Sequence, residues 1–340
     1  MSCVCDVKEN ITDLEMLGLL VLSIYNPTEE RLLKRARQYQ EDENTHIYAY
    51  NENEEYKGII VFEIVNRFAT ILDIAVKPEC QRNGIGSKLI DFIFNQFEID
   101  KVIAETDDDA VEFYKKCGFT VAPANEVSGI KRYICEFSSV SRHYNLLIED
   151  NNDPVNDQEP LKEYMDKWDG QQFIDSLKLS KQKSVLEIGV GTGRLAVRVS
   201  PLCGEFFGID ISPKTIERAK ENLKKYKNTT LICDDFNEHE FYRKFDVIYS
   251  SLTFMHIKDK QKAISKVSSI LNDGGRFVLS IDKNQNDYIE YGSRKVHIYP
   301  DSAEKTAKYI ANSGLTILNR YETEFAYVFV ARKTPDYISH

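Results

Sequence analysis

The sequence predicts two domains, an α+β domain over residues 1–140 and a doubly wound α/β domain with a closing β-hairpin over residues 161–340. Three observations carry this prediction. Strand-like segments follow one another in the first half, whereas strands and helices alternate regularly in the second half. Between them, residues 144–161 contain no Lys or Arg, while acids, amides and two prolines accumulate. We therefore expect an acidic linker over residues 141–160.

Length and charge narrow the class of protein. A chain of 340 residues is long enough for two domains with separate hydrophobic cores. The formal net charge of −10 opposes binding to phosphate backbones, which predicts that nucleic acid is not a partner. The longest apolar stretch, residues 16–22, is too short to span a bilayer, and the first residues lack the basic start of a signal peptide. We expect a cytoplasmic protein that does not enter a membrane.

The cysteines predict neither disulfides nor a metal site. There are seven, an odd number, without a disulfide framework or the paired C-x-x-C spacing of zinc sites. Cys3 and Cys5 alone supply only half of a tetrahedral site, and a short N-terminal strand accounts for them. We expect reduced thiols and no bound metal.

The first domain is expected to begin with two helices and to continue with strands. Thr12 and Glu15 form a capping-box pattern that predicts a helix start. β-branched and aromatic residues predict the strands, and the polar residues 51–55 predict the first hairpin turn. In chain order, the expected elements are helices 12–25 and 28–40, strands 46–50, 58–65 and 70–76, helix 84–97, strand 102–105, helix 108–116, and strands near 119 and over 132–137.

The second domain alternates strands with helices. This alternation indicates a parallel sheet with right-handed crossovers, and ligands of such sheets bind beyond the carboxyl ends of the strands. In chain order, the expected elements are helix 161–177, strand 184–188, helix 193–199, strand 206–209, helix 213–226, strands 230–233 and 247–250, helix 259–271, strand 277–281, and a hairpin of 315–321 with 325–331.

A glycine loop follows the first strand of this domain. The buried strand 184–188 runs directly into Gly189-x-Gly191-x-Gly193 and then into a helix, so backbone can approach a ligand closely there. A dinucleotide fingerprint has the spacing G-x-G-x-x-G, but position 194 is Arg194. The loop therefore favours a ligand without a pyrophosphate.

Acidic residues follow the next two strands. Asp210 ends the second strand, 21 residues after Gly189, at a position from which a carboxylate can accept both hydroxyls of a ribose. Asp234, Asp235 and Phe236 follow the third strand and suit the amino edge and the ring face of an adenine. Together with the glycine loop, these residues predict a nucleoside-type ligand.

These residues resemble the class I S-adenosylmethionine-dependent methyltransferase family, and the resemblance covers residues 161–333. It includes the glycine turn within 271–277 and the closing hairpin. The family implies a Rossmann-like fold with S-adenosylmethionine as cofactor, bound by the glycine loop and by the residues after the second and third strands. The cofactor-binding residues that the resemblance implies are Glu187, Gly189, Gly191, Gly193, Asp210, Ile211, Asp234, Asp235, Phe236 and Ser250. A doubly wound domain that binds another nucleotide, or none, is the alternative.

His256 is the candidate catalytic residue of this domain. It resembles a histidine that similar small-molecule methyltransferases place near the methyl-transfer site, and a role as base and a role in ordering its loop are both open. The loop after the fourth strand lacks the Asn/Asp-Pro-Pro-aromatic and Pro-Cys patterns of nucleic-acid methyltransferases, which favours a small-molecule acceptor. Tyr164 and Trp168 are expected either to shield the cofactor or to pack in the core.

A second glycine loop lies in the first domain, where strand 70–76 leads into residues 81–87 with the sequence Gln-Arg-Asn-Gly-Ile-Gly-Ser. Its backbone N–H groups can converge on a diphosphate, and the following helix adds its positive end. The loop is not a Walker loop, because it is too short and Gly86 is followed by Ser87 and Lys88 instead of Lys-Ser/Thr.

This loop resembles the one with which the GNAT acetyltransferase family binds the pyrophosphate of acetyl-CoA, and residues 107–119 look like a later helix of that family. The resemblance implies that Tyr114 protonates the departing thiolate of CoA and that the strand pairs with the pantetheine arm. The implied acetyl-CoA-binding residues are Ile74, Val76, Gln81, Arg82, Asn83, Gly84, Gly86 and Ser87. The alternative is that Tyr114 packs beside Phe113 and that the loop caps a helix. The base stays open among three acids, Glu63, Asp73 and Glu105.

The two resemblances together predict a bifunctional transferase with S-adenosylmethionine and acetyl-CoA as cofactors. We expect methyl transfer to a small-molecule acceptor, with a protein acceptor as the less favoured choice, and acetyl transfer to an amine. The alternative is a methyltransferase whose first domain is a non-catalytic acyl-CoA sensor or a dimerisation module. The sequence indicates neither an oligomeric state nor the identity of either acceptor.

Overall fold

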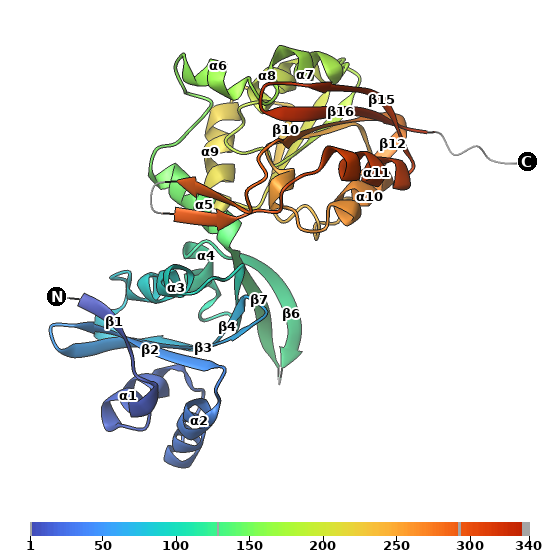
Figure 1. The fold of residues 1–340 in the computed structure, drawn as a ribbon. Coiled ribbons are helices and arrows are strands. Elements are labelled where there is room, and N and C mark those ends of the chain that lie inside the picture. Colours follow the sequence, from blue (N-terminus) through green and yellow to red (C-terminus); the bar gives the residue numbers. More distant parts are fainter. Residues whose placement is uncertain (1, 128, 292–293, 335–340) are drawn as a thin grey trace, which may run out of the picture. The chain divides into compact units, whose positions relative to one another are not determined.

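The computed structural model describes residues 2–127, 129–291 and 294–334, and the chain forms two compact units, Met1–Ser139 and Val140–His340. Each unit has its own sheet and its own hydrophobic clusters. Colours run from blue through cyan in the first unit and from green to red in the second (Figure 1).

The first unit is an α+β fold around a seven-stranded sheet with the order β1-β2-β3-β4-β5-β7-β6. Neighbouring strands are antiparallel except β4 and β5, which run parallel and are joined by a helical crossover. In chain order, its strands and α-helices are β1 (Ser2–Asp6), α1 (Leu14–Leu20), α2 (Glu29–Glu41), β2 (Thr45–Glu52), β3 (Glu55–Val65), β4 (Phe68–Val76), α3 (Ile85–Gln96), β5 (Lys101–Thr106), α4 (Val111–Lys116), β6 (Thr120–Val127) and β7 (Ile130–Ser138).

Helices cover both faces of the first sheet (Figure 1). α1 and α2 pack on one face, where Leu19 and Ala36 meet Ile47 and Val61 of the strands. α3 and α4 pack on the opposite face around Phe62 of β3. The unit therefore buries apolar surface on both sides of its sheet, which is the main stabilising term for a domain of this size.

The first helix does not begin with the expected capping box. Its N-cap is Asp13, whose side chain makes no capping hydrogen bond, so the Thr12–Glu15 pattern does not act as predicted. Asp13 Oδ2 instead accepts a hydrogen bond from Asn10 Nδ2 at 3.1 Å. This local side-chain contact in the preceding turn competes with capping.

The second unit is a doubly wound α/β fold around a seven-stranded sheet with the order β10-β9-β8-β11-β12-β16-β15, and the predicted closing hairpin of β15 and β16 is confirmed. In chain order, its strands and α-helices are α5 (Ser139–Glu149), α6 (Leu161–Met165), α7 (Gly170–Ser176), β8 (Ser184–Ile188), α8 (Ala196–Val199), β9 (Glu205–Asp210), α9 (Pro213–Leu223), β10 (Thr229–Cys233), β11 (Phe245–Ser251), α10 (Lys260–Ile270), β12 (Leu271–Asp282), β13 (Tyr288–Tyr291), β14 (Arg294–His297), α11 (Ala303–Asn312), β15 (Leu315–Glu322) and β16 (Ala326–Lys333).

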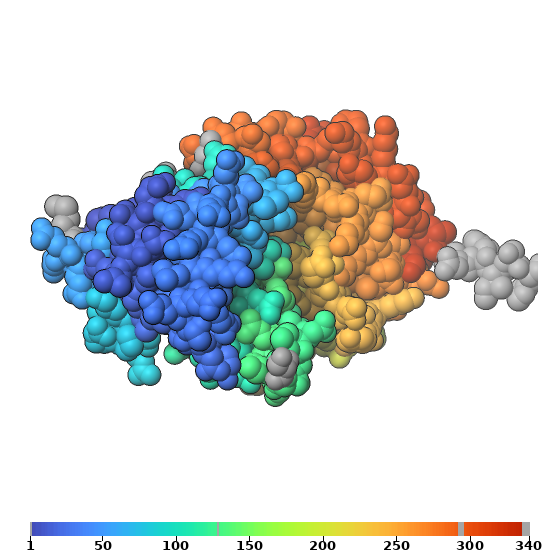
Figure 2. All heavy atoms as spheres, turned by 90° about the horizontal axis from the view of Figure 1, so that it is seen from below, coloured from blue at the N-terminus to red at the C-terminus, as the bar shows by residue number. Residues whose placement is uncertain are grey.

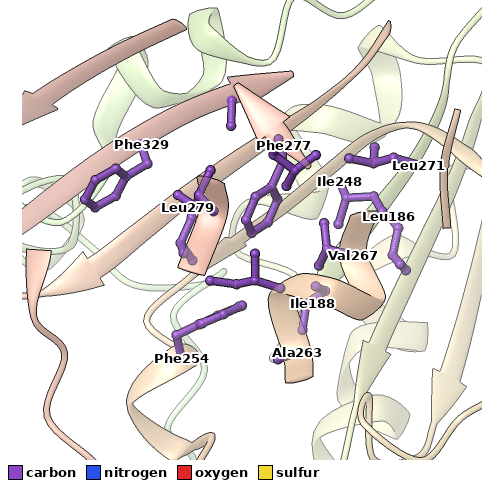
Figure 3. Packing of buried hydrophobic residues seen from close by; sticks show 14 of the residues in the cluster. Leu186, Ile188, Ile248, Phe254, Ala263, Val267, Leu271, Phe277, Leu279 and Phe329 are labelled. Atoms are coloured by element: carbon purple, nitrogen blue, oxygen red, sulfur yellow. The ribbon is translucent and has the colours of Figure 1, made fainter. Parts of the chain in front are cut away.

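The core of the second unit lies on both faces of its sheet. On one face, α7, α8 and α9 cover the central strands around Val185 and Phe206. On the other, Ala263 and Val267 of α10 contact the side chains of β8, β11 and β12, among them Phe277 (Figure 3). In Figure 2, later segments of this unit, coloured orange, lie together on the face that is shown. Helices thus pack on both faces of the sheet, and this packing fixes the positions of its strands.

The segment expected as an acidic linker is folded. Its first part is helix α5, and Asn145 on this helix accepts hydrogen bonds from Ser212 Oγ at 2.9 Å and from Lys214 N at 3.1 Å. Further along, Asp153 accepts hydrogen bonds from Arg218 and Asn222. Composition suggested a linker because these polar side chains are numerous, but they are satisfied by partners that are distant in sequence.

The helix expected over residues 161–177 is divided in two. α6 ends at Met165 and α7 starts at Gly170, because Asp169 caps α7 and Gly170 has a φ of +68° that an uninterrupted α-helix excludes. The sequence analysis also did not anticipate the β13–β14 hairpin or α11, which lie between β12 and the closing hairpin. The described residues contain no helix that is long and apolar enough to cross a membrane.

Replacing Asn145 by Ala is expected to lower the free energy of unfolding by about 1–3 kcal/mol, because Ser212 Oγ and Lys214 N lose a buried acceptor. Chemical denaturation of the full chain measures the change. Lys220→Ala, on an exposed position of the neighbouring helix α9, serves as the control and should change the free energy by no more than about 0.5 kcal/mol. Equal effects of the two substitutions would contradict the role of α5 as a folded part of this unit.

Candidate functional site

The second sheet reverses its winding direction between β8 and β11. The chain passes from β8 to β9 and β10 on one side and then crosses to β11 on the other. The carboxyl ends of β8 and β11 form the topological switch point, where open α/β sheets bind ligands. Gly189 and Ser250 lie there, and Ser250 Oγ donates to the backbone oxygen of Ile188 at 2.9 Å. The hydroxyl of Ser250 thus joins the two strand ends.

The glycine loop after β8 is held in left-handed backbone conformations. Gly189, Gly191 and Gly193 have φ angles of +75°, +56° and +98°, which glycine adopts without strain. A Cβ at position 189 would lie 2.0 Å from Thr253 Oγ1, whereas no described atom lies within 4 Å of a Cβ at position 191. Gly189 is therefore required by its contact with the loop after β11, and the space beside Gly191 is open to a ligand.

Asp210 at the end of β9 holds this loop. Its Oδ2 accepts a hydrogen bond from Gly191 N and its Oδ1 accepts one from Ser212 N, each at 3.0 Å. Burial raises the pKa of the carboxyl group, and the backbone N–H groups act in the opposite direction. Each oxygen has a further lone pair that can accept a ligand hydroxyl. Beside it, the carbonyl of Ile211 accepts a hydrogen bond from Ser141 Oγ of α5 at 3.1 Å.

The residues after β10 have different roles. Asp234 N donates to the backbone oxygen of Asp210 at 3.0 Å, which places Asp234 next to the site. Its Oδ2 lies 2.8 Å from His239 Nδ1, and its Oδ1 accepts from Asp235 N. Phe236, expected beside an adenine, instead packs in the hydrophobic core. No group of three or more His, Cys, Asp and Glu residues in the described chain is arranged to hold a metal ion.

Glu187 is the third acid at the switch point and only 3% exposed. Its Oε2 accepts a hydrogen bond from Tyr249 Oη at 2.8 Å. Burial raises the pKa of Glu187 to about 8, although the bond from Tyr249 and the charge of Arg194 oppose the shift. The carboxyl group is therefore largely protonated near neutral pH and can ionise when a cation approaches it.

Arg194 has a structural partner that the sequence analysis missed. Its guanidinium forms a two-pronged ion pair with Asp169, in which Nη1 donates to Oδ1 at 3.0 Å and Nη2 to Oδ2. Asp169 also accepts hydrogen bonds from Gly170 N at 2.7 Å and from Ser251 Oγ at 2.8 Å. This buried carboxylate links α7, the glycine loop and β11. The sequence contained only one signal for the role of Asp169, its position before Gly170, because its partners Arg194 and Ser251 are 25 and 82 residues away.

His256 lies in the turn Phe254–His256 after β11. Its Nε2 is 2.9 Å from the hydroxyl of Tyr144 on α5, a residue that the sequence analysis did not single out. Burial, with smaller effects from His143 and Lys260, lowers the pKa of His256 to about 3, so the ring is neutral near pH 7. The structure therefore brings the candidate catalytic residue together with the helix that also contacts Ile211 and Ser212.

Tyr164 and Trp168 pack against the closing hairpin. Trp168 Nε1 donates to Asp282 Oδ2 at 2.9 Å, and its ring lies 4.7 Å from that of Phe325. The Tyr164 ring is 5.3 Å from the Trp168 ring and its side chain remains exposed. Trp168 is thus half-buried and Tyr164 exposed, so neither is a core residue, and shielding of the cofactor stays a prediction.

In the first unit, β4 and β5 separate along their length. They pair from Phe68 with Lys101 to Ile71 with Ala104, and beyond this point β4 pairs with β3 alone. Ile74 and Val76 lie in the part of β4 that has left β5. An open strand edge of this kind can pair with an extended ligand arm.

The loop between β4 and α3 exposes backbone N–H groups. Arg82 and Gly84 have positive φ angles of +62° and +75°, and Gly84 is the N-cap of α3 without a side-chain hydrogen bond. The N–H groups of the first turn of α3 are therefore available to an anion. Gln81 Nε2 donates to the backbone oxygen of Val76 at 3.2 Å, and Asn83 is exposed. The predicted loop residues up to Gly84 thus lie together at a helix N-terminus.

Gly86 and Ser87 contact α4. A Cβ at position 86 would lie 2.7 Å from the ring of Phe113, and Ser87 Oγ is 3.3 Å from Cys117 Sγ. Tyr114 is 4% exposed and packs between Phe113 and Phe119, with ring centroids 5.1 Å apart in each pair. Burial raises the pKa of the Tyr114 hydroxyl, which keeps its proton at neutral pH.

Asp73 lies where β4 leaves β5 and is the one buried member of the three candidate bases. Its Oδ2 accepts a hydrogen bond from Tyr39 Oη at 2.6 Å and is 2.9 Å from Arg35 Nη2. Burial raises its pKa, while Tyr39 and Arg35 oppose this shift. Glu105, in contrast, is exposed and pairs with Arg132 at 2.9 Å. Of the three acids, Asp73 is thus the buried one, and its carboxyl group is held by Tyr39 and Arg35, while the choice of base stays open.

Substituting Gln for Glu187 is expected to stabilise the ligand-free protein increasingly as pH rises. The folded-state pKa of Glu187 is raised to about 8 from an ordinary value of about 4.5. Between these two pH values the carboxyl group ionises in the unfolded chain but stays protonated in the fold, so the native chain loses stability as pH rises. The free energy of unfolding of Glu187→Gln minus that of the native chain should grow by a few kcal/mol across this range. Denaturation at several pH values measures it. Glu217→Gln, at an exposed site on α9, is the control, and a pH-independent difference for Glu187→Gln would refute the prediction.

Comparisons with known proteins match two regions of the chain. Residues 179–318 match the model of a methyltransferase domain, and residues 42–121 match that of the acetyltransferase (GNAT) domain. A malonyl-[acyl-carrier protein] O-methyltransferase of Ilyobacter polytropus is 32% identical over 107 residues, which are 31% of this chain and 40% of the relative. An uncharacterized methyltransferase of Anoxybacillus flavithermus is 34% identical over 123 residues, 35% of this chain and 57% of the relative.

The chain thus spans about half the length of these curated relatives. Among solved structures, a magnesium protoporphyrin IX methyltransferase from Synechocystis with bound SAM is similar at a TM-score of 0.47 and 18% identity, over 57% of this chain and 95% of that one. The chain therefore joins a region that matches the acetyltransferase (GNAT) domain to a region that matches a methyltransferase domain.

Proposed function

We propose that the second unit transfers a methyl group from S-adenosylmethionine to a small-molecule acceptor. The observation that carries the proposal is the pair of Gly191 and Asp210 at the switch point, where open space beside a left-handed glycine adjoins a carboxylate with free acceptor capacity. The methyltransferase-domain match over residues 179–318 supports it. When bound, the donor supplies an electrophilic methyl group through its sulfonium.

The acids of the site fit the parts of this donor. Asp210 would accept hydrogen bonds from the ribose hydroxyls, and Asp234 and Asp235 would meet the amino edge of adenine. Glu187, which is easily ionised by a nearby cation because its pKa is about 8, would balance the positive charge of the donor. The chain itself contributes binding, orientation and exclusion of water, which account for much of the rate of such a transfer.

We also propose that the first unit transfers an acetyl group from acetyl-CoA to an amine. Support comes from the open edge of β4, the uncapped N-terminus of α3 and the GNAT-domain match over residues 42–121. Tyr114, which stays protonated, would supply the proton for the departing thiolate, and Asp73 would accept the proton of the amine. The relative named malonyl-[acyl-carrier protein] O-methyltransferase is a methyltransferase, and its name gives no support to acetyl transfer.

One observation favours a second function for the first unit. Tyr114 is packed on both sides by Phe113 and Phe119, as a residue of the core would be. This supports an acyl-CoA-binding unit without turnover, in which the ring of Tyr114 stabilises α4 and its hydroxyl has no chemical role. The two candidates differ in whether acetyl-CoA is consumed.

Asp210→Asn is expected to weaken binding of S-adenosylmethionine by about 10–100-fold, because charge-assisted hydrogen bonds to the ribose contribute about 1.5–3 kcal/mol. Isothermal titration calorimetry on the full chain measures the dissociation constant. Asp273→Asn, at the exposed start of β12, is the matched control and should leave it unchanged. The absence of binding by the native chain would disprove the proposed donor.

Tyr114→Phe distinguishes the two functions of the first unit. If the unit is an acetyltransferase, acetyl-CoA should bind unchanged by calorimetry while transfer of isotope-labelled acetyl to amines of a metabolite extract falls by about 10²–10⁴-fold. If it is a sensor, the native chain binds acetyl-CoA without transferring the label, and the substitution has no effect on either measurement. Mass spectrometry of the extract detects the product.

A further inference from the structure

The ring of His256 has one satisfied and one unsatisfied nitrogen. Nε2 is 2.9 Å from Tyr144 Oη, whereas Nδ1 is buried and has no hydrogen-bond partner in the part of the chain that the structure describes. A buried ring nitrogen that makes no hydrogen bond costs about 1–3 kcal/mol. Such a cost at the switch point of a ligand-binding sheet indicates that a ligand atom completes the site.

The hydroxyl of Tyr144 is the group that can determine which nitrogen of His256 carries the proton. Burial, with the nearby charge of Asp210, raises the pKa of the Tyr144 hydroxyl, so this group keeps its hydrogen. Nε2 is the acceptor that lies within reach of that hydrogen among the described residues. When the hydroxyl donates to Nε2, the neutral ring carries its own proton on Nδ1. His256 then presents an N–H donor.

The surroundings of His256 make it a poor base. Its Nε2 lone pair is occupied by Tyr144, and burial with the charges of His143 and Lys260 disfavours a second proton. Lys260 Nζ is held close by, donating to the backbone oxygens of Phe254 at 2.7 Å and of Tyr299 at 2.8 Å. An acceptor that must lose a proton during methyl transfer would find no base in this residue.

The acids near this residue have partners in the fold, although Asp301 Oδ2 is buried without a hydrogen-bond partner among the described residues. Asp301 lies 3.0 Å from Lys260 Nζ, and Asp210 accepts two backbone N–H groups of the donor site. The Lys260 ammonium is therefore balanced by Asp301, and the atom of His256 that the described residues leave without a partner is Nδ1. If Nδ1 carries the proton, its N–H is a donor without a partner, and a negatively charged acceptor atom forms the stronger hydrogen bond with it.

Resting on the proposed methyl transfer, we infer that the acceptor is a carboxylate, bound through a hydrogen bond from His256 Nδ1–H, and that Tyr144 is the positioning residue that fixes this tautomer. A carboxylate is ionised at neutral pH and needs no base. A lone pair of its oxygen forms the new C–O bond while the S–CH₃ bond breaks and its electron pair passes to sulfur. The carboxylate and sulfonium charges cancel, the products are a methyl ester and a thioether, and no proton is released.

The position of Tyr144 ties this acceptor site to the donor site. α5 is anchored by Ser141 on Ile211 and by Asn145 on Ser212, both directly after Asp210. It also lies beside the β13–β14 hairpin, where the rings of His143 and Tyr291 are 6.3 Å apart (Figure 1). Ordering of the loop after β9 therefore also orders the hydrogen bond between Tyr144 and His256.

The acceptor class is tested with methyl-tritiated S-adenosylmethionine and an extract of small metabolites. Methyl esters release volatile tritiated methanol in mild alkali, whereas N-methyl and aryl O-methyl products do not. We expect the transferred label to be alkali-labile, and transfer at saturating S-adenosylmethionine, which holds Glu187 ionised, to be nearly independent of pH between about 6 and 9, because the acceptor loses no proton. Alkali-stable label would overturn the carboxylate and leave the methyltransferase proposal standing.

Substitutions separate a hydrogen-bond donor from a base. Gln retains an N–H donor but cannot act as a base, so His256→Gln should keep at least tenfold more activity than His256→Ala. Equal losses would contradict the inferred role. Tyr144→Phe should lower transfer by about tenfold or more with unchanged calorimetric affinity for S-adenosylmethionine. Tyr226→Phe, which removes a hydroxyl bonded to Val197 O at 3.0 Å elsewhere in the unit, is the matched control and should retain activity.

The tautomer itself gives a result that needs no acceptor. In ¹⁵N-histidine-labelled full chain, with His256 assigned from the His256→Gln spectrum, we expect a protonated Nδ1 and an unprotonated Nε2 that persist to below pH 5. Tyr144→Phe should shift the ring toward the Nε2–H tautomer, and Tyr226→Phe should not. A native ring protonated on Nε2 would overturn the inference, even if the extract contains no acceptor. Failure to bind S-adenosylmethionine at all would instead refute the proposed function.

Discussion

The carboxylate of Asp210 is the interaction on which the second unit's site depends. By accepting the N–H groups of Gly191 and Ser212, it joins the loop after β8 to the turn after β9. The ends of the neighbouring strands β8 and β9 are thereby held next to each other. Asn145 on α5 in turn accepts a hydrogen bond from Ser212 in the same turn. The position of α5, and with it that of Tyr144, therefore also depends on Asp210. The hydrogen bonds to each oxygen offset part of the cost of burying the carboxyl group, whose pKa nevertheless stays raised because burial dominates.

Much of the sheet could be read from the sequence because its strands are continuous runs of buried apolar residues. Strand 184–188 has the predicted bounds, and the glycines that follow it have the left-handed conformations that their pattern implied. Asp210 was also predictable, since an acid at the end of a second parallel strand meets the loop after the first. These features depend on local patterns and on a topology with few alternatives.

The remainder of the site depends on contacts between distant segments. Residues 141–160 resemble a linker in composition, and only the partners of Asn145 and Asp153 on α9 and in the turn before it reveal them as folded. In the sequence, Arg194 served only to show that the loop lacks the last glycine of a dinucleotide fingerprint. In the structure, its charge forms an ion pair with Asp169. Phe236 was assigned to a ligand because aromatic residues suit both an adenine and a core, and packing decided for the core. No local pattern distinguishes these cases.

Thr253 restricts which residues can occupy position 189, because the two positions are in direct contact. The Thr253 hydroxyl and methyl group occupy the volume in which a side chain at position 189 would start, and the closest approach would be 2.0 Å. A larger residue at 189 could be accepted only together with a smaller one at 253 and a backbone that tolerates a φ of +75°. The constraint acts in one direction only, because a smaller residue at 253 is compatible with Gly189, whereas a side chain at 189 is not compatible with Thr253.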